Sequence, residues 1–256
     1  MPYHIGRKHD FENGRSRRLM INGTGKVVRL LLLSQTYYAD VWDLQRSIFS
    51  QLLKGEKCDT LILCEHPPVY TLGRVTKASN ILFTDDELKK IGAEKFEIER
   101  GGDVTFHGPG QLVGYPLLNL AHFKEDLGWY LRALEETIIF TLKEYKVISF
   151  RIPGRTGVWV GGKGKEEKIC AIGIKVSRWC TMHGFAFNVN NDLSYFERII
   201  PCGIGDKKVT SLEKVLGRKI EMEEVNQYYL EAFKKVFEIE FQLIPADQVF
   251  APASVL

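Results

Sequence analysis

Hydrophobic positions along the chain follow two periods, one of two residues and one near 3.6, and their alternation predicts strands interleaved with helices. The first regular signal is a nearly continuous apolar run at 27–33, which is typical of a buried strand. Apolar residues then recur at helical spacing from Val41 to Leu52 and again from Leu127 to Tyr145. A last helix is expected near 222–237. These elements predict amphipathic helices packed on a sheet.

The remaining strand-like stretches indicate how that sheet is built. Two lie in the first half of the chain, at 60–64 and 111–120. Three more, rich in β-branched and aromatic residues, follow at 157–160, 168–176 and 179–189. The short loops between these three favour an antiparallel meander. The predicted fold class is therefore α/β (α+β), a single domain with a mixed, largely antiparallel sheet and packed helices.

Turn and capping signals divide the chain further. Thr84 and Glu87 have the spacing of a capping box, which predicts a short helix ended by Gly92. The stretch 65–74 contains two prolines and is expected to be a turn that leads into extended chain.

No repeat or low-complexity linker interrupts the chain from Val27 to Phe241, so we expect one folded domain at 27–242. Residues 1–26 are polar, basic and glycine-rich, which indicates an N-terminal extension, and 243–256 form a C-terminal tail. An arginine-rich extension is compatible with a transit peptide, but its two acidic residues and single serine favour a surface arm.

Composition excludes several classes of protein. With 45% hydrophobic and 26% charged residues, the chain has the composition of a soluble globular protein. The longest apolar runs are far shorter than the roughly 18 residues of a membrane span. A net charge of +3 does not indicate a nucleic-acid partner.

The five cysteines are too sparse for a disulfide scaffold, which favours a reducing compartment. We therefore expect a cytoplasmic location, or an organelle if the extension is a transit peptide. No Cys-x-x-Cys spacing occurs, and Cys64 and His66 lack a second ligand pair nearby, so no metal site is expected.

A glycine-dense segment at 100–111 is the first candidate for chemistry. It holds four glycines, an arginine and a histidine, and glycine at this density lets the backbone approach a ligand and present N–H groups to it. The pattern is neither a P-loop nor a dinucleotide-binding fingerprint. A plain turn is the alternative interpretation.

Three further residues are candidates, each with a structural alternative. Lys168 begins an apolar strand and can point into a cavity, or it is an exposed residue at a strand end. His183 precedes a glycine within a strand-like stretch, where a core histidine is the alternative. Cys202 lies between Pro201 and Gly203, a setting that suits a thiolate nucleophile, although a free cysteine is more often inert and buried.

Taken together, four blocks resemble the lipoyl(octanoyl) transferase family in content and order: 65–74, 100–120, 168–189 and 192–204. The resemblance spans Val27 to Leu216, and the interval from Lys168 to Cys202, 202 − 168 = 34 residues, matches it. It implies a catalytic domain with a biotin/lipoate protein ligase-like fold. It also implies that Cys202 is the acyl-thioester nucleophile and that Lys168 lowers the pKa of its thiol.

The resemblance further implies an acyl pocket. Its expected lining residues are Arg100, Gly101, Gly102, Asp103, Val104, Thr105, Phe106, His107, Ala171, Ile172, Gly173, Gly184, Phe185 and Ala186. Asp103 stands where glutamine is common in the family, and Phe106 where tyrosine is common. N–H groups of the glycine-dense segment, with His107 or His183 in support, are expected to stabilise an oxyanion.

The implied reaction moves an octanoyl group from acyl carrier protein to a lysine of lipoyl domains, in 2-oxoacid dehydrogenase complexes and in the glycine cleavage H protein. The expected enzyme is a monomer with no cofactor beyond the carrier's phosphopantetheine. Two other functions stay open from the residues themselves: an ATP-dependent lipoate or octanoate ligase, and a non-enzymatic binder of the same partner proteins. Ligases need no nucleophilic thiol, so Cys202 favours the transferase.

Overall fold

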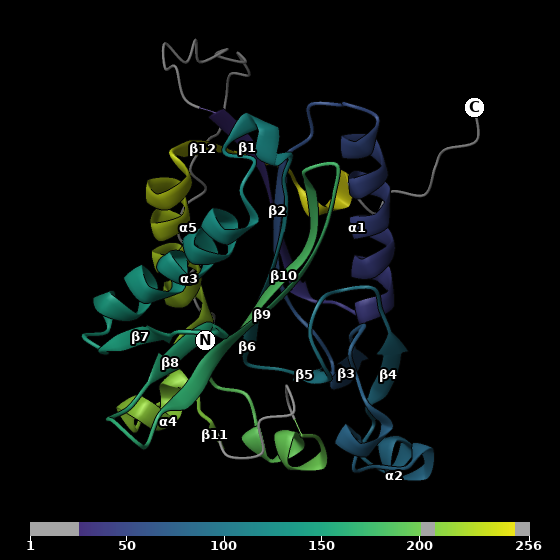
Figure 1. Ribbon diagram of the computed structural model, residues 1–256, viewed down its shortest axis with the longest axis vertical. Coiled ribbons are helices and arrows are strands. Elements are labelled where there is room, and N and C mark those ends of the chain that lie inside the picture. The colour runs from purple at the N-terminus through teal and green to yellow at the C-terminus, as the bar shows by residue number, and fades with distance from the viewer. Residues whose placement is uncertain (1–25, 201–207, 249–256) are drawn as a thin grey trace, which may run out of the picture.

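A long twisted sheet passes through the molecule and carries helices on both faces (Figure 1). The computed structural model describes residues 26–200 and 208–248. Within them the main sheet is formed, in spatial order, by β12 (Ile239–Leu243), β1 (Lys26–Gln35), β2 (Thr60–Glu65), β6 (Gln111–Leu117), β10 (Cys180–Asn188), β9 (Glu167–Ser177), β8 (Arg155–Val160) and β7 (Ser149–Ile152). A short strand, β11 (Lys208–Val209), pairs with β9 outside this order.

Strand directions confirm the predicted mixed sheet. Strand β1 runs parallel to β2 and β12, and β11 runs parallel to β9. All other neighbours in the main sheet are antiparallel, including the predicted meander of β8, β9 and β10. The sheet is therefore largely antiparallel.

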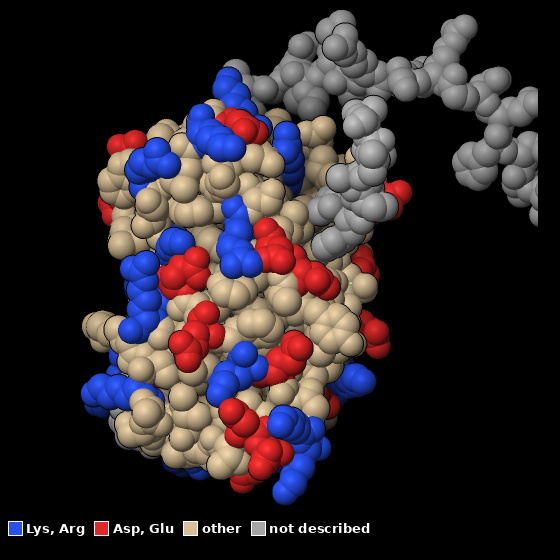
Figure 2. All heavy atoms as spheres, turned by 90° about the vertical axis from the view of Figure 1, so that its right-hand side faces the viewer, with Lys and Arg blue, Asp and Glu red and all other residues tan. Residues whose placement is uncertain are grey.

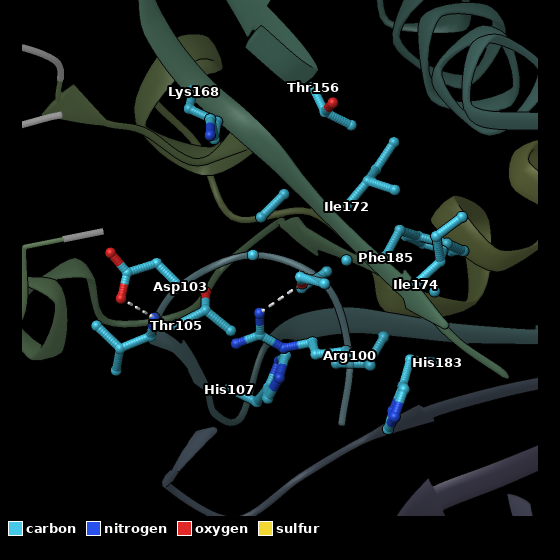
Figure 3. A pocket seen from close by; sticks show the side chains of 18 of the residues that line it. Arg100, Asp103, Thr105, His107, Thr156, Lys168, Ile172, Ile174, His183 and Phe185 are labelled. Carbon is cyan, nitrogen blue, oxygen red and sulfur yellow. Dashed lines mark hydrogen bonds between the residues drawn. The ribbon is translucent and has the colours of Figure 1, made fainter. Parts of the chain in front are cut away.

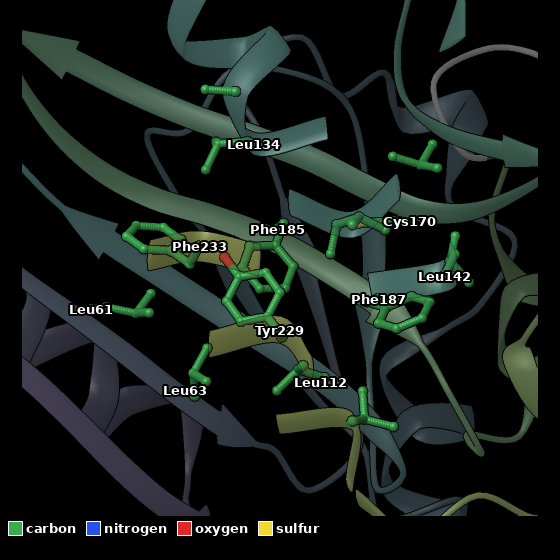
Figure 4. Packing of buried hydrophobic residues seen from close by; sticks show 14 of the residues in the cluster. Leu61, Leu63, Leu112, Leu134, Leu142, Cys170, Phe185, Phe187, Tyr229 and Phe233 are labelled. Carbon is green, nitrogen blue, oxygen red and sulfur yellow. The ribbon is translucent and has the colours of Figure 1, made fainter. Parts of the chain in front are cut away.

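Two helices cover one face of this sheet, and a third covers the other (Figure 1). The first face carries α3 (Leu127–Glu144) and α5 (Met222–Phe237), which agree with the predicted helices. The second carries α1 (Tyr38–Leu53), whose apolar stripe is buried as expected. On the face of α3 and α5, the Phe185 ring packs on Tyr229 with centroids 4.8 Å apart, within the cluster shown in Figure 4.

A second, three-stranded sheet was not predicted. It consists of β4 (Glu94–Glu97), β3 (Val69–Leu72) and β5 (Thr105–His107), beside α2 (Asp85–Lys90). Strands this short show too few alternations for a periodic signal, so the sequence predicted only extended chain around β3. The capping box at the start of α2 is confirmed, because the side chains of Thr84 and Glu87 each bond the other's backbone N–H.

The predicted domain boundaries fall near both ends of the described chain. Strand β12 reaches Leu243, one residue past the boundary expected at 242, and Ile244 N–H donates to the Leu30 carbonyl at 2.9 Å. The 1–25 part of the predicted extension and the 249–256 part of the predicted tail lie outside the described residues.

The surface carries charges of both signs. On the side that faces right in Figure 1, Lys and Arg alternate with Asp and Glu, and no large area of one sign is visible (Figure 2). None of the helices in 26–200 and 208–248 combines the length and apolar character needed to cross a membrane.

Candidate active site

A cavity of about 520 Å³ lies between the glycine-dense segment, β9 and β10. Its walls also include β6 and the first residue of α1, Tyr38. Figure 3 shows the side chains that line it, with Arg100 and His107 among them. The volume falls within the range of small-molecule sites, and the apolar side chains of Ile172 and Phe185 form part of the wall.

Most of the residues expected from the sequence meet at this cavity. It is lined by Arg100, Gly101, Gly102, Asp103, Val104, Thr105, His107, Lys168, Ala171, Ile172, Gly173, His183, Gly184, Phe185 and Ala186. They come from segments far apart in the chain. In Figure 3, Lys168 and His183 lie on opposite sides of the group.

Phe106 is the expected pocket residue that the structure does not place in the lining. Its ring is buried in a separate apolar cluster and stacks on Tyr195, with ring centroids 4.4 Å apart. Strand alternation explains this, because Phe106 lies between Thr105 and His107 in β5 and its side chain leaves the opposite face.

The glycine-dense segment reaches β9 because β8 leaves part of the β9 edge open. Pairing between β8 and β9 ends at Cys170. Beyond that residue, Gly101 N–H donates to the Ile174 carbonyl at 2.8 Å. A Cβ on Gly173 would lie 3.0 Å from both the Gly101 carbonyl oxygen and Arg100 Cδ. Glycine at 173 therefore permits the close approach that shapes this wall.

Gly184 has a similar role between β10 and β6. A Cβ there would lie 2.1 Å from the Gly114 carbonyl oxygen and 2.7 Å from Pro116 Cδ. The two strands can pair at this point only if residue 184 has no side chain. Pairing of β10 with β6 therefore explains the glycine of the His183–Gly184 pair.

Arg100 is held by protein groups. Its Nη2 donates to the carbonyl oxygen and to Oγ1 of Thr71, at 2.7 and 3.1 Å, and its Nη1 donates to the Gly101 carbonyl at 3.1 Å. These bonds join the glycine-dense segment to β3. The guanidinium thereby fixes the shape of the cavity wall.

His107 has a defined tautomer. Gln111 Nε2 donates to Phe106 O and to Asn188 Oδ1, so Gln111 Oε1 is the acceptor for His107 Nδ1–H at 2.9 Å. His107 Nε2 then accepts from the Thr71 hydroxyl at 3.3 Å. The one N–H of the neutral ring is committed to Gln111 and is not available to an oxyanion.

His183 has a different environment. Its φ of 62° is in the left-handed region, a conformation that costs about 1 kcal/mol or more in a strand. Its side chain is buried, and neither ring nitrogen has a hydrogen-bond partner within the described structure. Its backbone N–H donates to Gln45 Oε1 at 3.1 Å, which ties β10 to α1.

Some lining residues were missed in the sequence, among them Tyr38, Ile98, Gln111, Val113, Tyr115, Leu131 and Phe196. Alternation in β6 was a usable signal for three of them, because Gln111, Val113 and Tyr115 share one face of the strand. Nothing in the local sequence around Tyr38, Ile98, Leu131 and Phe196 indicated that they line a cavity.

A third buried histidine, His66, is hydrogen-bonded to Tyr115 of the cavity wall. His66 donates from Nδ1 to the Thr36 carbonyl at 2.7 Å and accepts the Tyr115 hydroxyl at Nε2 at 2.8 Å. Burial is the main cause that lowers the pKa of His66 to about 4 and the pKa values of His107 and His183 to about 3. All three are neutral at pH 7.

We predict that this histidine cluster makes the fold acid-sensitive. In the unfolded chain these groups have pKa values near 6.5, so the unfolded state binds protons first as the pH falls below that value. Stability should be full above pH 7 and should decrease from pH 6.5 toward the folded values, by on the order of 1 kcal/mol or more per histidine. Urea unfolding at pH 7 and pH 5 measures the loss.

His66→Gln is the matched variant, because it removes one titrating group. In this variant the free energy of unfolding should differ less between pH 7 and pH 5 than in the wild type. Carboxylates contribute little above pH 5, since their unfolded pKa values are near 4. An equal free energy of unfolding at pH 7 and pH 5 contradicts the prediction.

Lys168 lies at the cavity, opposite Trp159 of β8, and its Nζ is 4.8 Å from the centroid of that ring. On its other side, Val209 of β11 pairs with it, and Thr210 N–H donates to its carbonyl at 3.0 Å. Lys168 is thus held between β8 and the chain that follows residue 207.

Cys202 lies outside the described residues. The nearest described residues on either side are Ile200, whose N–H donates to the Asn80 carbonyl at 2.9 Å, and Lys208, which pairs with Glu167. The four described cysteines, Cys58, Cys64, Cys170 and Cys180, are all buried free thiols, and burial raises the pKa of each thiol.

Residues 37–234 match the model of the lipoyl protein ligase A/B catalytic domain, so the chain belongs to that family. The fold agrees. A bipartite lipoate protein ligase from Thermoplasma acidophilum superposes with a TM-score of 0.67 at 16% identity, covering 87% of this chain and 89% of that chain. A lipoate-protein ligase A bound with ATP gives a TM-score of 0.66 at 17% identity, with 86% and 90% covered.

Sequence relatives narrow the assignment. The octanoyltransferase of Rubrobacter xylanophilus is 51% identical over 203 residues, which cover 78% of this chain and 89% of the relative. That of Christiangramia forsetii is 48% identical over 218 residues, covering 80% and 93%. Within the larger family the chain is thus an octanoyltransferase family member, and the enzyme class is acyltransferase, as the sequence blocks predicted.

Proposed function

We propose that the enzyme transfers an octanoyl group from acyl carrier protein to a lysine of lipoyl domains through a thioester on Cys202. The observation that carries the proposal is the cavity that joins an apolar wall to Lys168, in a chain of the octanoyltransferase family. The raised thiol pKa of the four described cysteines supports Cys202 as the nucleophile, since a protonated buried thiol is inert.

In the first half-reaction the Cys202 sulfur attacks the carbonyl carbon of the carrier thioester. A new C–S bond forms, the C–S bond to phosphopantetheine breaks, and the proton of the Cys202 thiol passes by way of Lys168 to the departing carrier thiolate. One thioester replaces another, so the step is nearly isoenergetic and needs no ATP. The backbone N–H groups of the glycine-dense segment are the proposed oxyanion donors.

In the second half-reaction the ε-amine of the acceptor lysine attacks the Cys202 thioester. A C–N bond forms, the C–S bond to Cys202 breaks, and Lys168 takes the proton of the amine and returns it to the Cys202 thiolate. The products are an octanoyl amide and the free enzyme. Proton transfer by a positioned side chain of this kind contributes about 10²- to 10⁴-fold in rate.

The apolar wall supports selection of the acyl chain. Ile172, Phe185 and Val113 line the cavity, and burying six methylenes there contributes about 5 kcal/mol at roughly 0.8 kcal/mol each. We expect an acyl chain longer than the cavity to be excluded by steric conflict.

The proposed acceptors are the lipoyl domains of 2-oxoacid dehydrogenase complexes and the glycine cleavage H protein. The proposed enzyme acts as a monomer in the cytoplasm, with no cofactor of its own and no resident metal. The weak positive charge acts on the encounter rate with acidic protein substrates.

The experiment that tests this function compares two octanoyl donors. Purified enzyme is mixed with an apo lipoyl domain and either octanoyl-acyl carrier protein without ATP, or free octanoate with ATP and magnesium. We expect the mass of one octanoyl group on the lipoyl domain only with the carrier thioester. Modification that requires ATP and free octanoate establishes a ligase. No modification by verified folded protein contradicts the proposed function and supports a non-enzymatic binder.

A further inference from the structure

Asp103 is a charged residue of the cavity wall whose carboxylate is held by the protein. The side chain is buried, with 6% of the residue exposed. Its Oδ1 accepts the backbone N–H of Val104 at 2.7 Å, the bond drawn beside Asp103 in Figure 3. Its Oδ2 accepts a hydrogen bond from the side-chain amide of Asn80. Each carboxylate oxygen therefore has a protein donor.

Asn80 connects Asp103 to a third segment. Its backbone carbonyl accepts the Ile200 N–H at 2.9 Å. The next residues continue the contact, because Ile81 forms an antiparallel bridge with Ile199 and Leu82 N–H donates to the Arg198 carbonyl at 2.9 Å. The chain that enters the Cys202 region is thus paired, up to Ile200, with residues 80–82.

The direction of these bonds explains why an aspartate suits position 103. A carboxylate only accepts, and it faces two donors, the Val104 N–H and the Asn80 amide. Hydrogen bonds to a charged acceptor are stronger than neutral ones. A glutamine at this position would be longer by one methylene and would carry an amide that presents a donor.

We propose that Asp103 is a positioning residue that orients Asn80 and, through the Asn80 carbonyl, sets the position of the chain two residues before Cys202. The inference rests on the proposed role of Cys202 as nucleophile. It changes the role that the sequence suggested for Asp103, from a substrate contact to a support for the nucleophile. The other flank of the same region is attached to Lys168 through Val209.

The test exchanges the two side chains. Asp103→Asn leaves one of the two donors without an acceptor, and Asn80→Asp sets two carboxylates against each other. In the double variant Asp103→Asn/Asn80→Asp, the new amide donates to the new carboxylate and still accepts from Val104. Asp85→Asn, which changes an exposed aspartate paired with Lys95 at the start of α2, is the matched control.

We expect each single variant to lower kcat between about tenfold and a hundredfold, with KM for octanoyl-acyl carrier protein changed less than about twofold. Alkylation of Cys202 by iodoacetamide, followed by peptide mass, should slow in parallel. The double variant should recover both rates, and Asp85→Asn should match wild type. Thermal melting confirms that each variant is folded.

A raised KM at unchanged kcat assigns Asp103 to substrate contact and overturns the proposal, as does a double variant no better than the singles. Mass spectrometry of the octanoyl adduct on Cys202 distinguishes failure of the proposed function from failure of the role proposed for Asp103. Absence of an octanoyl adduct on Cys202 of the wild-type enzyme refutes the proposed function. An adduct in wild type, with unaffected single variants, refutes only the role of Asp103.

Discussion

Replacement of Cys202 by alanine is expected to reduce octanoyl transfer by about three orders of magnitude or more, because the covalent route needs a thiolate and no other described cysteine is suited to supply one. Intact-mass spectrometry after incubation with octanoyl-acyl carrier protein should show one octanoyl adduct on wild type and none on the variant. Peptide mapping should place the adduct on the peptide with Cys202.

Cys180→Ala is the control for this experiment. Cys180 is buried beside the turn between β9 and β10, and its thiol pKa is raised by burial. The control should keep the adduct and the rate, with a loss of stability of about 1 kcal/mol from the small cavity. Normal transfer by Cys202→Ala would disprove the thioester route and leave the family assignment unchanged.

Replacement of Lys168 should have the second largest effect. Lys168→Ala is expected to slow both half-reactions, by about 10²- to 10⁴-fold in overall rate, because both need proton transfer at the same place. Lys168→Arg keeps a positive charge near the Trp159 ring but supplies no base at neutral pH. It should therefore bind octanoyl-acyl carrier protein normally and still turn over slowly.

Rapid-quench measurement separates the two half-reactions by following adduct formation and then its transfer to a lipoyl domain. Lys175→Ala is the matched control on the same strand, since its Nζ pairs with Glu99 at 3.0 Å and it does not line the cavity. The control should retain the wild-type rate. If Lys168→Ala retains it as well, Lys168 has no role in proton transfer.

The cavity wall shows how local and long-range information combine. Close backbone approach was predicted for the glycine-dense segment that contains Gly101, and the family resemblance placed Gly173 and Gly184 in the expected pocket. The sequence did not show which groups each glycine contacts. Gly173 lies against Arg100 and Gly101, and Gly184 lies against β6. Such contacts join residues far apart in the sequence, and they leave no periodic pattern.

Phe106 and Asp103 illustrate the same limit for side-chain direction. Both belong to the glycine-dense segment and were expected to line one pocket. Strand alternation turns the Phe106 ring into another cluster, and two donors hold the Asp103 carboxylate. Neighbours in the sequence thus have side chains in different surroundings, and only the fold determines which surroundings each one has.

By itself the sequence determined the long helices, the meander of β8, β9 and β10, the family and the residues to suspect. Each of these depends on local composition, on a period of two or 3.6, or on short blocks of residues. All of these signals come from residues that are close together in the sequence. The tertiary structure alone decided the second sheet, the contribution of Tyr38 and β6 to the cavity, and the link from Asp103 through Asn80 to Ile200. These features come from packing between distant segments, where the partner of a residue is chosen by the fold and not by its neighbours in sequence.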